Sequence, residues 1–149
     1  MTVQLVHPYL VAPVGLLVGG GVGFAVTRMA RRVEKWDANL TLPLLTGVAG
    51  AHLVLIPVVE LERQVMFGLY VLAVIAVVAL AMLDRRIWRL GAVLLPVGSI
   101  LGYAYFAVLV HQADYVGLGV KLVELAAVAA AVTPLLNRRR AREARPKLA

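Results

Sequence analysis

The chain of 149 residues contains no cysteine and few charged residues. Without cysteine it forms no disulfide, and it offers no thiolate to zinc or to an iron–sulfur cluster. Charged residues make up only 15% of the chain, whereas apolar residues make up 62%. A soluble domain is about half apolar. The composition therefore indicates a protein embedded in lipid.

The chain also lacks a long polar segment, because none exceeds about a dozen residues. That length leaves no room for a soluble nucleotide-binding domain. No glycine-rich loop carries the Lys and the Ser or Thr that hold phosphate groups. Neither a nucleophile–base pair nor a pair of catalytic carboxylates is visible. We therefore predict a protein that is not an enzyme.

Five apolar runs are each long enough to cross a bilayer as a helix. A hydrocarbon core of about 30 Å requires about 20 helical residues at about 1.5 Å each. The alternating segments of a transmembrane barrel are absent. We predict an all-α integral membrane protein, with a five-transmembrane-helix bundle in residues 1–137 and a basic cytoplasmic tail at 138–149. The predicted helices cover residues 9–27, 40–59, 65–83, 90–110 and 115–136.

The basic residues predict the orientation of the bundle. Thirteen of the fifteen Lys and Arg residues lie in three clusters, at 28–35, at 85–89 and in the tail. Short basic loops remain on the cytoplasmic side of a membrane. Five crossings then place the N-terminus outside and the C-terminus in the cytoplasm, in a plasma or inner membrane. We expect the basic residues to face anionic lipids of the inner leaflet and, despite the net charge of +7, to bind no nucleic acid.

The fifth apolar run is unusual because it contains two charged residues, Lys121 and Glu124. Each charge at the centre of a membrane helix costs about 2.5–3.5 kcal/mol on insertion scales. The pair can neutralise itself at its i, i+3 spacing. If this run did not cross, the basic tail would lie outside, against the charge rule. We therefore predict five crossings, with a four-helix arrangement as the alternative.

Polar residues within the apolar runs gather at one predicted depth. His52, Tyr70, Tyr103, Lys121 and Glu124 lie roughly 9 to 13 Å below the outer ends of their helices. An ionisable residue inside a membrane segment indicates a functional site by default. We expect Lys121 and Glu124 to be neighbours. We also expect His52 to face them across the bundle and Tyr103 to donate a hydrogen bond to the carboxylate.

This cluster has three open interpretations. In the first, it lines a cavity that binds a small ligand or carries protons, with Glu124 as the carboxylate, Lys121 tuning it and His52 relaying protons. In the second, it is a structural salt bridge that fixes the helix register. In the third, the charged face docks onto a partner subunit. We favour a transporter-like or small-ligand-binding membrane protein; the alternative is a non-catalytic accessory subunit of a larger membrane complex.

Small residues predict where helices approach one another closely, because packing in lipid depends on them. Gly15, Gly19 and Gly23 form one face of the first helix, and Gly98 and Gly102 repeat this spacing in the fourth. These glycines either pack against other helices of the same bundle, or they contact another copy of the chain or another membrane subunit. The third helix, which is almost wholly aliphatic, is expected at the periphery.

No metal ion and no cofactor are predicted. His111 and Asp114, with the acidic residues of the 60–63 loop, are too few and too poorly anchored to hold a metal. A haem needs axial ligands at matched depth, and His52 and His111 differ in depth. Pro57 follows His52 by five residues and is expected to distort the backbone near that histidine.

Overall fold

The computed structural model describes residues 8–31, 40–83, 87–109 and 114–143. Within these ranges the regular structure is helical. The elements, in chain order, are α1 (Pro8–Arg31), α2 (Thr41–Leu55), the short 3-10 helix η1 (Ile56–Val58), α3 (Leu61–Met82), α4 (Trp88–Leu109) and α5 (Tyr115–Glu143). All five α-helices of the described chain contain a stretch long and apolar enough to cross a membrane. The all-α, five-helix prediction is confirmed to that extent.

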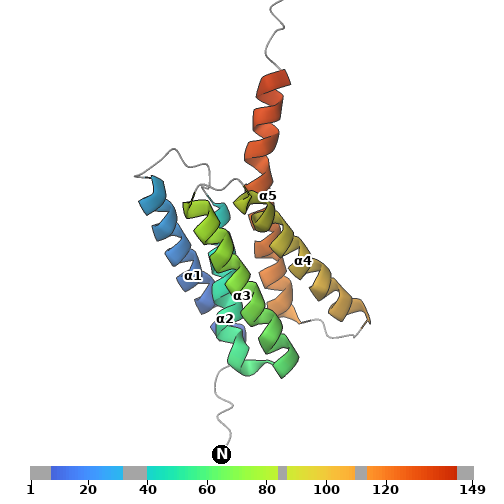
Figure 1. The fold of residues 1–149 in the computed structure, drawn as a ribbon. Helices are drawn as coiled ribbons and strands as arrows, with labels where there is room; N and C mark the ends of the chain where they lie inside the picture. The colour runs from blue at the N-terminus through green and yellow to red at the C-terminus, as the bar shows by residue number, and fades with distance from the viewer. Residues whose placement is uncertain (1–7, 32–39, 84–86, 110–113, 144–149) are drawn as a thin grey trace, which may run out of the picture.

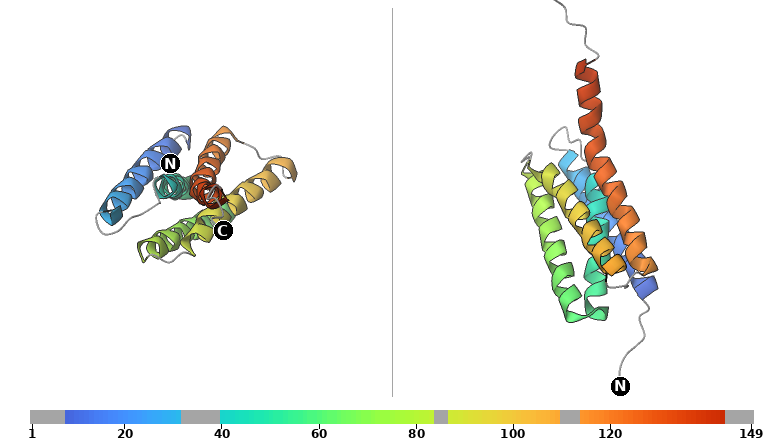
Figure 2. Two further views of the ribbon diagram at one scale, coloured as in Figure 1. Left: turned by 90° about the horizontal axis from the view of Figure 1, so that it is seen from above. Right: turned by 90° about the vertical axis from the view of Figure 1, so that its right-hand side faces the viewer.

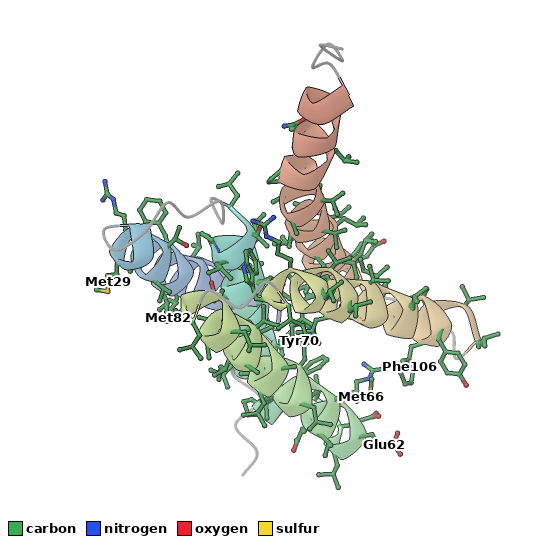
Figure 3. All side chains as sticks on the ribbon, turned by 45° about the horizontal axis from the view of Figure 1, so that its top comes forward. Met29, Glu62, Met66, Tyr70, Met82 and Phe106 are labelled. Atoms are coloured by element: carbon green, nitrogen blue, oxygen red, sulfur yellow. The ribbon has the colours of Figure 1, made fainter. Side chains whose placement is uncertain are left out.

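Successive helices run in opposite directions, so the bundle has two ends (Figure 1). The starts of α1, α3 and α5 lie at the end that also holds η1, which we call the η1 end. At the opposite end α3 and α4 pack together, where Val77, Ala81, Trp88 and Ala92 belong to one buried apolar cluster. The two helices separate toward the η1 end (Figures 1 and 3).

The central helix of the bundle is α2 (Figure 2). Half of its membrane-length stretch is buried, compared with 11% for α4. Its small residues, among them Gly47, Ala49 and Ala51, explain this position, because they let the backbones of its neighbours approach. Helices α1, α3 and α5 all pack against α2.

The glycine face predicted in α1 packs against α2. A Cβ atom added to Gly15 would overlap the carbonyl of Gly50, and one added to Gly19 would overlap the carbonyl of Thr46. At Gly23 an added Cβ atom would overlap the Thr46 side chain and lie 2.8 Å from a backbone atom of α2. The structure therefore uses this face within the bundle.

Gly98 and Gly102 of α4 behave differently. An added Cβ atom would meet nothing within 4 Å at either position. Both glycines line a cavity instead. Within the described chain they do not form the predicted helix-packing face, and their contact with another copy stays a prediction.

The aliphatic helix α3 is peripheral on one side only. Leu61 and Leu72 are largely exposed, whereas Val74 and Val77 are buried in the core. The prediction that the third helix is peripheral therefore holds only for its outward face.

The second and third helices differ from their predicted limits at their shared connection. The predicted helix at 40–59 is divided, because α2 ends at Leu55 and η1 carries Pro57 near its start. Proline has no N–H to donate and fits the first turn of a helix. Helix α3 then begins at Leu61 rather than at residue 65.

The fifth helix is longer than predicted. It continues to Glu143, past the expected end at residue 136, and projects beyond the other helices (Figure 1). The first residues of the predicted basic tail are thus helical. The remainder of that tail and most of the two basic loops lie outside the described residues.

Candidate functional site

The charged pair of α5 is buried between helices. Lys121 Nζ lies 2.9 Å from Glu124 Oε2, as the i, i+3 spacing predicts. Lys121 Nζ also donates a hydrogen bond to the hydroxyl of Ser99 on α4. The Glu124 side chain is fully buried, whereas that of Lys121 is 11% exposed. The pair therefore links α5 to α4, and the lysine is the more accessible member.

His52 lies on the face of α2 that meets α3. Its Nδ1 is 2.8 Å from the carbonyl oxygen of Val48. Because a carbonyl oxygen only accepts, Nδ1 carries the hydrogen, and Nε2 of the neutral ring is left as an acceptor. The imidazole stacks on the Tyr70 ring, with centroids 4.6 Å apart, and meets the edge of Phe67 at the same distance. His52 thus belongs to an aromatic group rather than directly to the charged pair.

Tyr70 connects the aromatic group to the charged pair. Its ring stacks on His52, and its hydroxyl lies near the carboxyl group of Glu124. That approach is looser than a hydrogen bond, because Tyr70 Oη and Glu124 Oε1 are both buried without a hydrogen-bond partner. An unsatisfied buried polar atom costs about 1–3 kcal/mol. The site therefore retains hydrogen-bonding capacity at this point.

Tyr103 does not make the predicted hydrogen bond to Glu124. Its hydroxyl donates to the carbonyl oxygen of Asp114 at 2.8 Å and accepts from the N–H of Asp114 at 3.2 Å. Asp114 in turn accepts a hydrogen bond from the N–H of Gly117, in the first turn of α5. Tyr103 therefore fastens α4 to the start of α5, and its ring lies 6.0 Å from Lys121 Nζ. The predicted hydrogen bond from Tyr103 to the carboxylate is therefore not formed, and Tyr70 does not form one in its place.

Two members of the site have no role in the prediction from sequence, although one of them, Tyr70, belongs to the predicted polar cluster. Tyr70 shares the predicted depth of the others, and its position on an otherwise aliphatic helix was the available signal. Ser99 gave no such signal, because counting along α4 places it toward the opposite end of the bundle. Its contact depends on the long side chain of Lys121, which reaches across from α5.

A cavity of about 500 Å³ adjoins these residues, with walls from α2, α3, α4 and α5. Its polar lining includes His52, Tyr70, Ser99, Tyr103 and Lys121. The rest is mainly aliphatic and aromatic. Toward the η1 end the lining includes Asp114 and Arg63, whose guanidinium group lies 5.7 Å from the centre of the Phe106 ring. Figure 3 shows Met66 and Tyr70 of α3 and Phe106 of α4 in the space between those helices.

No group of three or more His, Asp and Glu side chains in the described part of the chain could hold a metal ion. His111, which the sequence offered as a weak ligand, lies outside the described residues. The charged groups that line the cavity are the Lys121 ammonium group, the Arg63 guanidinium group and the Asp114 carboxylate.

No protein-family model, curated protein or solved structure matches the chain. A five-helix architecture alone does not identify a function. The function is consequently argued from the cavity and the residues around it.

Proposed function

We propose that this protein is a transporter-like or small-ligand-binding membrane protein whose ligand occupies the cavity between α3, α4 and α5. Its five helices cross a plasma or inner membrane, with the N-terminus outside and the C-terminus in the cytoplasm. The η1 end is the outer end in this orientation. The protein has a binding role rather than a catalytic one.

The observation that carries the proposal is that Lys121 reaches a cavity of about 500 Å³. Sites for small molecules have volumes of about 300–1,000 Å³ and combine apolar walls with a few polar groups. Here Tyr70, Ser99 and Lys121 supply the polar groups at one place. The volume and the lining both support a ligand site.

A purely structural role for the charged pair explains less. A structural ion pair is favourable only when close packing and hydrogen bonds compensate both charges. Glu124 Oε1 and Tyr70 Oη lack such bonds, and Gly98 and Gly102 leave the opposite wall without side chains. The residues around the pair thus keep space open that larger side chains would close.

The proposed orientation rests on charge and on surface composition. The described helix ends that adjoin the basic clusters are the end of α1, the start of α4 and the end of α5. They lie opposite η1, and short basic loops remain in the cytoplasm. Large apolar side chains such as Leu17, Leu72 and Leu94 are exposed on the outer faces of α1, α3 and α4. Hydrocarbon would cover these side chains in a membrane.

The proposal is tested by filling the cavity from its bare wall. In the double variant Gly98→Leu/Gly102→Leu, two leucines project into the cavity. The control is Gly68→Leu on α3, where an added Cβ atom also meets nothing within 4 Å but which does not line the cavity. Each protein is purified in mild detergent, and the small molecules extracted from it are compared by mass spectrometry.

We expect one compound to be retained by the wild type and by Gly68→Leu and lost from the filled variant. Equal small-molecule content in all three proteins, with all three folded, would contradict a ligand site in this cavity.

A further inference from the structure

We propose that the ligand is an amphipathic molecule dissolved in the bilayer, with an apolar body and a hydrogen-bond-accepting oxygen, which enters the cavity between α3 and α4. A ketone or a carboxylate has the required oxygen. This inference rests on the proposed function, because it names the class of molecule for the same cavity.

The route of entry follows from the residues at the edge of the cavity. Met66 and Leu69 of α3 and Leu94 of α4 line the cavity, and they are 48%, 61% and 64% exposed. The cavity therefore reaches the surface between these helices, where they separate (Figures 1 and 3). In a membrane this surface faces hydrocarbon, so an apolar molecule reaches the site without passing through water.

The walls of the cavity fit an apolar body. Phe67, Leu95 and Phe106 contribute aromatic and aliphatic surface. On α4 the glycines at 98 and 102 leave a flat wall, against which a chain or a ring can lie. Contacts of this kind are individually weak but add up over a closely fitted body.

The charged pair determines the head group because its two members differ in access. Lys121 lines the cavity, whereas Glu124 is fully buried and does not. Two of the three N–H donors of the ammonium group serve Ser99 and Glu124, and within the described residues the third is left for a ligand. Asp114, unlike Glu124, places its carboxylate in the cavity lining. Its Oδ1 already accepts a hydrogen bond from the N–H of Gly117.

Tyr70 places a further hydroxyl behind the wall of the same part of the cavity, on the side of Glu124. Its hydroxyl is buried without a hydrogen-bond partner, and the residue lines the cavity. The N⁺–H donor of Lys121 favours an accepting oxygen, and the Tyr70 O–H joins it when the ring turns from Glu124 toward the ligand. A cationic head group at the same point would instead be repelled by Lys121, so this end of the cavity discriminates between the two.

The proposal can be tested with a single cysteine in this cysteine-free chain. Gly102→Cys places a thiol on the cavity wall, where its Cβ atom meets nothing within 4 Å. The protein is reconstituted in liposomes and treated with N-ethylmaleimide. The modification rate is measured with four probes of similar chain length: decanoate, 2-undecanone, decylammonium and undecane. Gly68→Cys, which lies outside the cavity, is the control.

We expect decanoate and 2-undecanone to slow the modification of the cysteine at 102 saturably, and decylammonium and undecane to have little effect. The control cysteine at 68 should react at the same rate with every probe. Equal protection by all four probes, or preferential protection by decylammonium, would overturn the head-group assignment. An unreactive cysteine at 102 in the folded protein would overturn the entry route.

Two conservative variants test the donors themselves. Tyr70→Phe and Ser99→Ala in the Gly102→Cys background each remove a hydroxyl and keep the remaining shape. Loss of the Tyr70 donor should weaken protection by 2-undecanone about two- to tenfold, the usual effect of one hydrogen bond. Loss of the Ser99 hydroxyl, which positions Lys121, should weaken protection by 2-undecanone by a similar factor. Tyr105→Phe, an exposed tyrosine of α4 outside the cavity, should change nothing.

The results separate this inference from the proposed function. Unchanged protection in both variants overturns the donor assignment. If the four probes fail but the cavity-filling double variant still loses a compound that the wild type retains, the ligand belongs to another chemical class and the ligand site stands. If that difference is also absent, the ligand site itself is contradicted.

Discussion

At the scale of single residues, the position of Glu124 depends on Lys121. The Glu124 side chain is fully buried, and its Oε2 lies 2.9 Å from the ammonium group. An isolated charge in such a place would be expensive, whereas a neighbouring opposite charge compensates much of that cost. The lysine thus has two roles in the account: it neutralises Glu124 and it presents a donor to the cavity.

This dependence predicts a strong asymmetry between single and double variants. Glu124→Met leaves Lys121 without its partner, and Lys121→Met leaves Glu124 without a counter-charge. Each should destabilise the protein by about 3–5 kcal/mol, while the double variant should lose far less than the sum. Thermal unfolding in detergent measures this coupling. Additive losses would show that the ion pair does not contribute to the fold.

A milder change separates function from stability. Glu124→Gln keeps the shape of the side chain and removes its charge. If Lys121 then turns toward the cavity without its counter-charge, decanoate should bind more tightly than to the wild type, because its carboxylate replaces the lost charge. Protection of the cysteine at 102 in the Gly102→Cys background measures this affinity, and the neutral ketone 2-undecanone is the control probe. A decrease in decanoate affinity with unchanged ketone affinity would contradict the assignment of Lys121.

Residue positions were predictable from the sequence only in part. The i, i+3 spacing was enough to bring Lys121 and Glu124 together, because it acts within one helix. The partners from other helices depend on helix rotation, which depth along a helix does not reveal. Tyr103 therefore turned out to bind the backbone of Asp114, and Tyr70 took the place beside Glu124.

At the scale of helices, the closest contact joins α1 and α2 through glycine. An added Cβ atom at Gly19 would overlap the α2 backbone, whereas at Gly21 on the same helix it meets nothing within 4 Å. Overpacking a close contact costs about 1–3 kcal/mol. Alanine at an open helical position instead stabilises by about 0.5–1 kcal/mol relative to glycine.

We therefore predict that Gly19→Ala lowers the unfolding temperature in detergent and that Gly21→Ala leaves it equal or higher. The two variants differ only in which face of α1 they alter. Equal effects of the two substitutions would show that α1 does not pack on α2 through this face.

Helix limits were predicted well where hydrocarbon thickness determines them and poorly elsewhere. The five apolar runs each became a helix, because length and hydropathy are properties of the segment itself. The end of α5 was missed because Arg138 marks the end of the apolar run rather than the end of the helix. Arginine is a good helix former, so the backbone continues beyond that point.

The longer α5 can be checked by solution NMR of the protein in detergent micelles. We expect helical Cα chemical shifts through residue 143, since α5 is helical to Glu143. Random-coil shifts from residue 137 onward would instead place the end of the helix at residue 136, as the apolar run predicts.

At the scale of the whole molecule, the sequence predicted the architecture, whereas a cavity was only one of three interpretations of the polar cluster. The number of helices follows from the apolar runs. The cavity arises because α3 and α4 pack at one end and separate toward the other, and no local pattern encodes that divergence. The spacing of the glycines at 98 and 102 predicts a packing face on the same local grounds, although in the structure they form a bare wall.

The proposed orientation predicts which single cysteines are accessible from outside the cell. Glu62→Cys, at the η1 end, should react with a membrane-impermeant thiol reagent in intact cells. Asn137→Cys, at the opposite end, should react only after the membrane is opened. The unaltered chain is the control, because it has no cysteine. The reverse pattern would contradict the charge-based orientation.

The accessory-subunit alternative concerns the assembly of the whole molecule. The glycine face on which it relied is occupied by α2, so a partner would need another surface. Purification in gentle detergent should therefore give a homogeneous particle of this chain alone. A foreign membrane subunit present in constant proportion would instead favour the alternative.

The central claim is that the space beside Tyr70 and Lys121 holds a molecule from the membrane. A density map of the protein in lipid nanodiscs tests it most directly. We expect elongated non-protein density between α3 and α4, with one end within hydrogen-bond distance of Lys121 Nζ. Helices α3 and α4 closed against each other, with their own side chains filling that space, would contradict it.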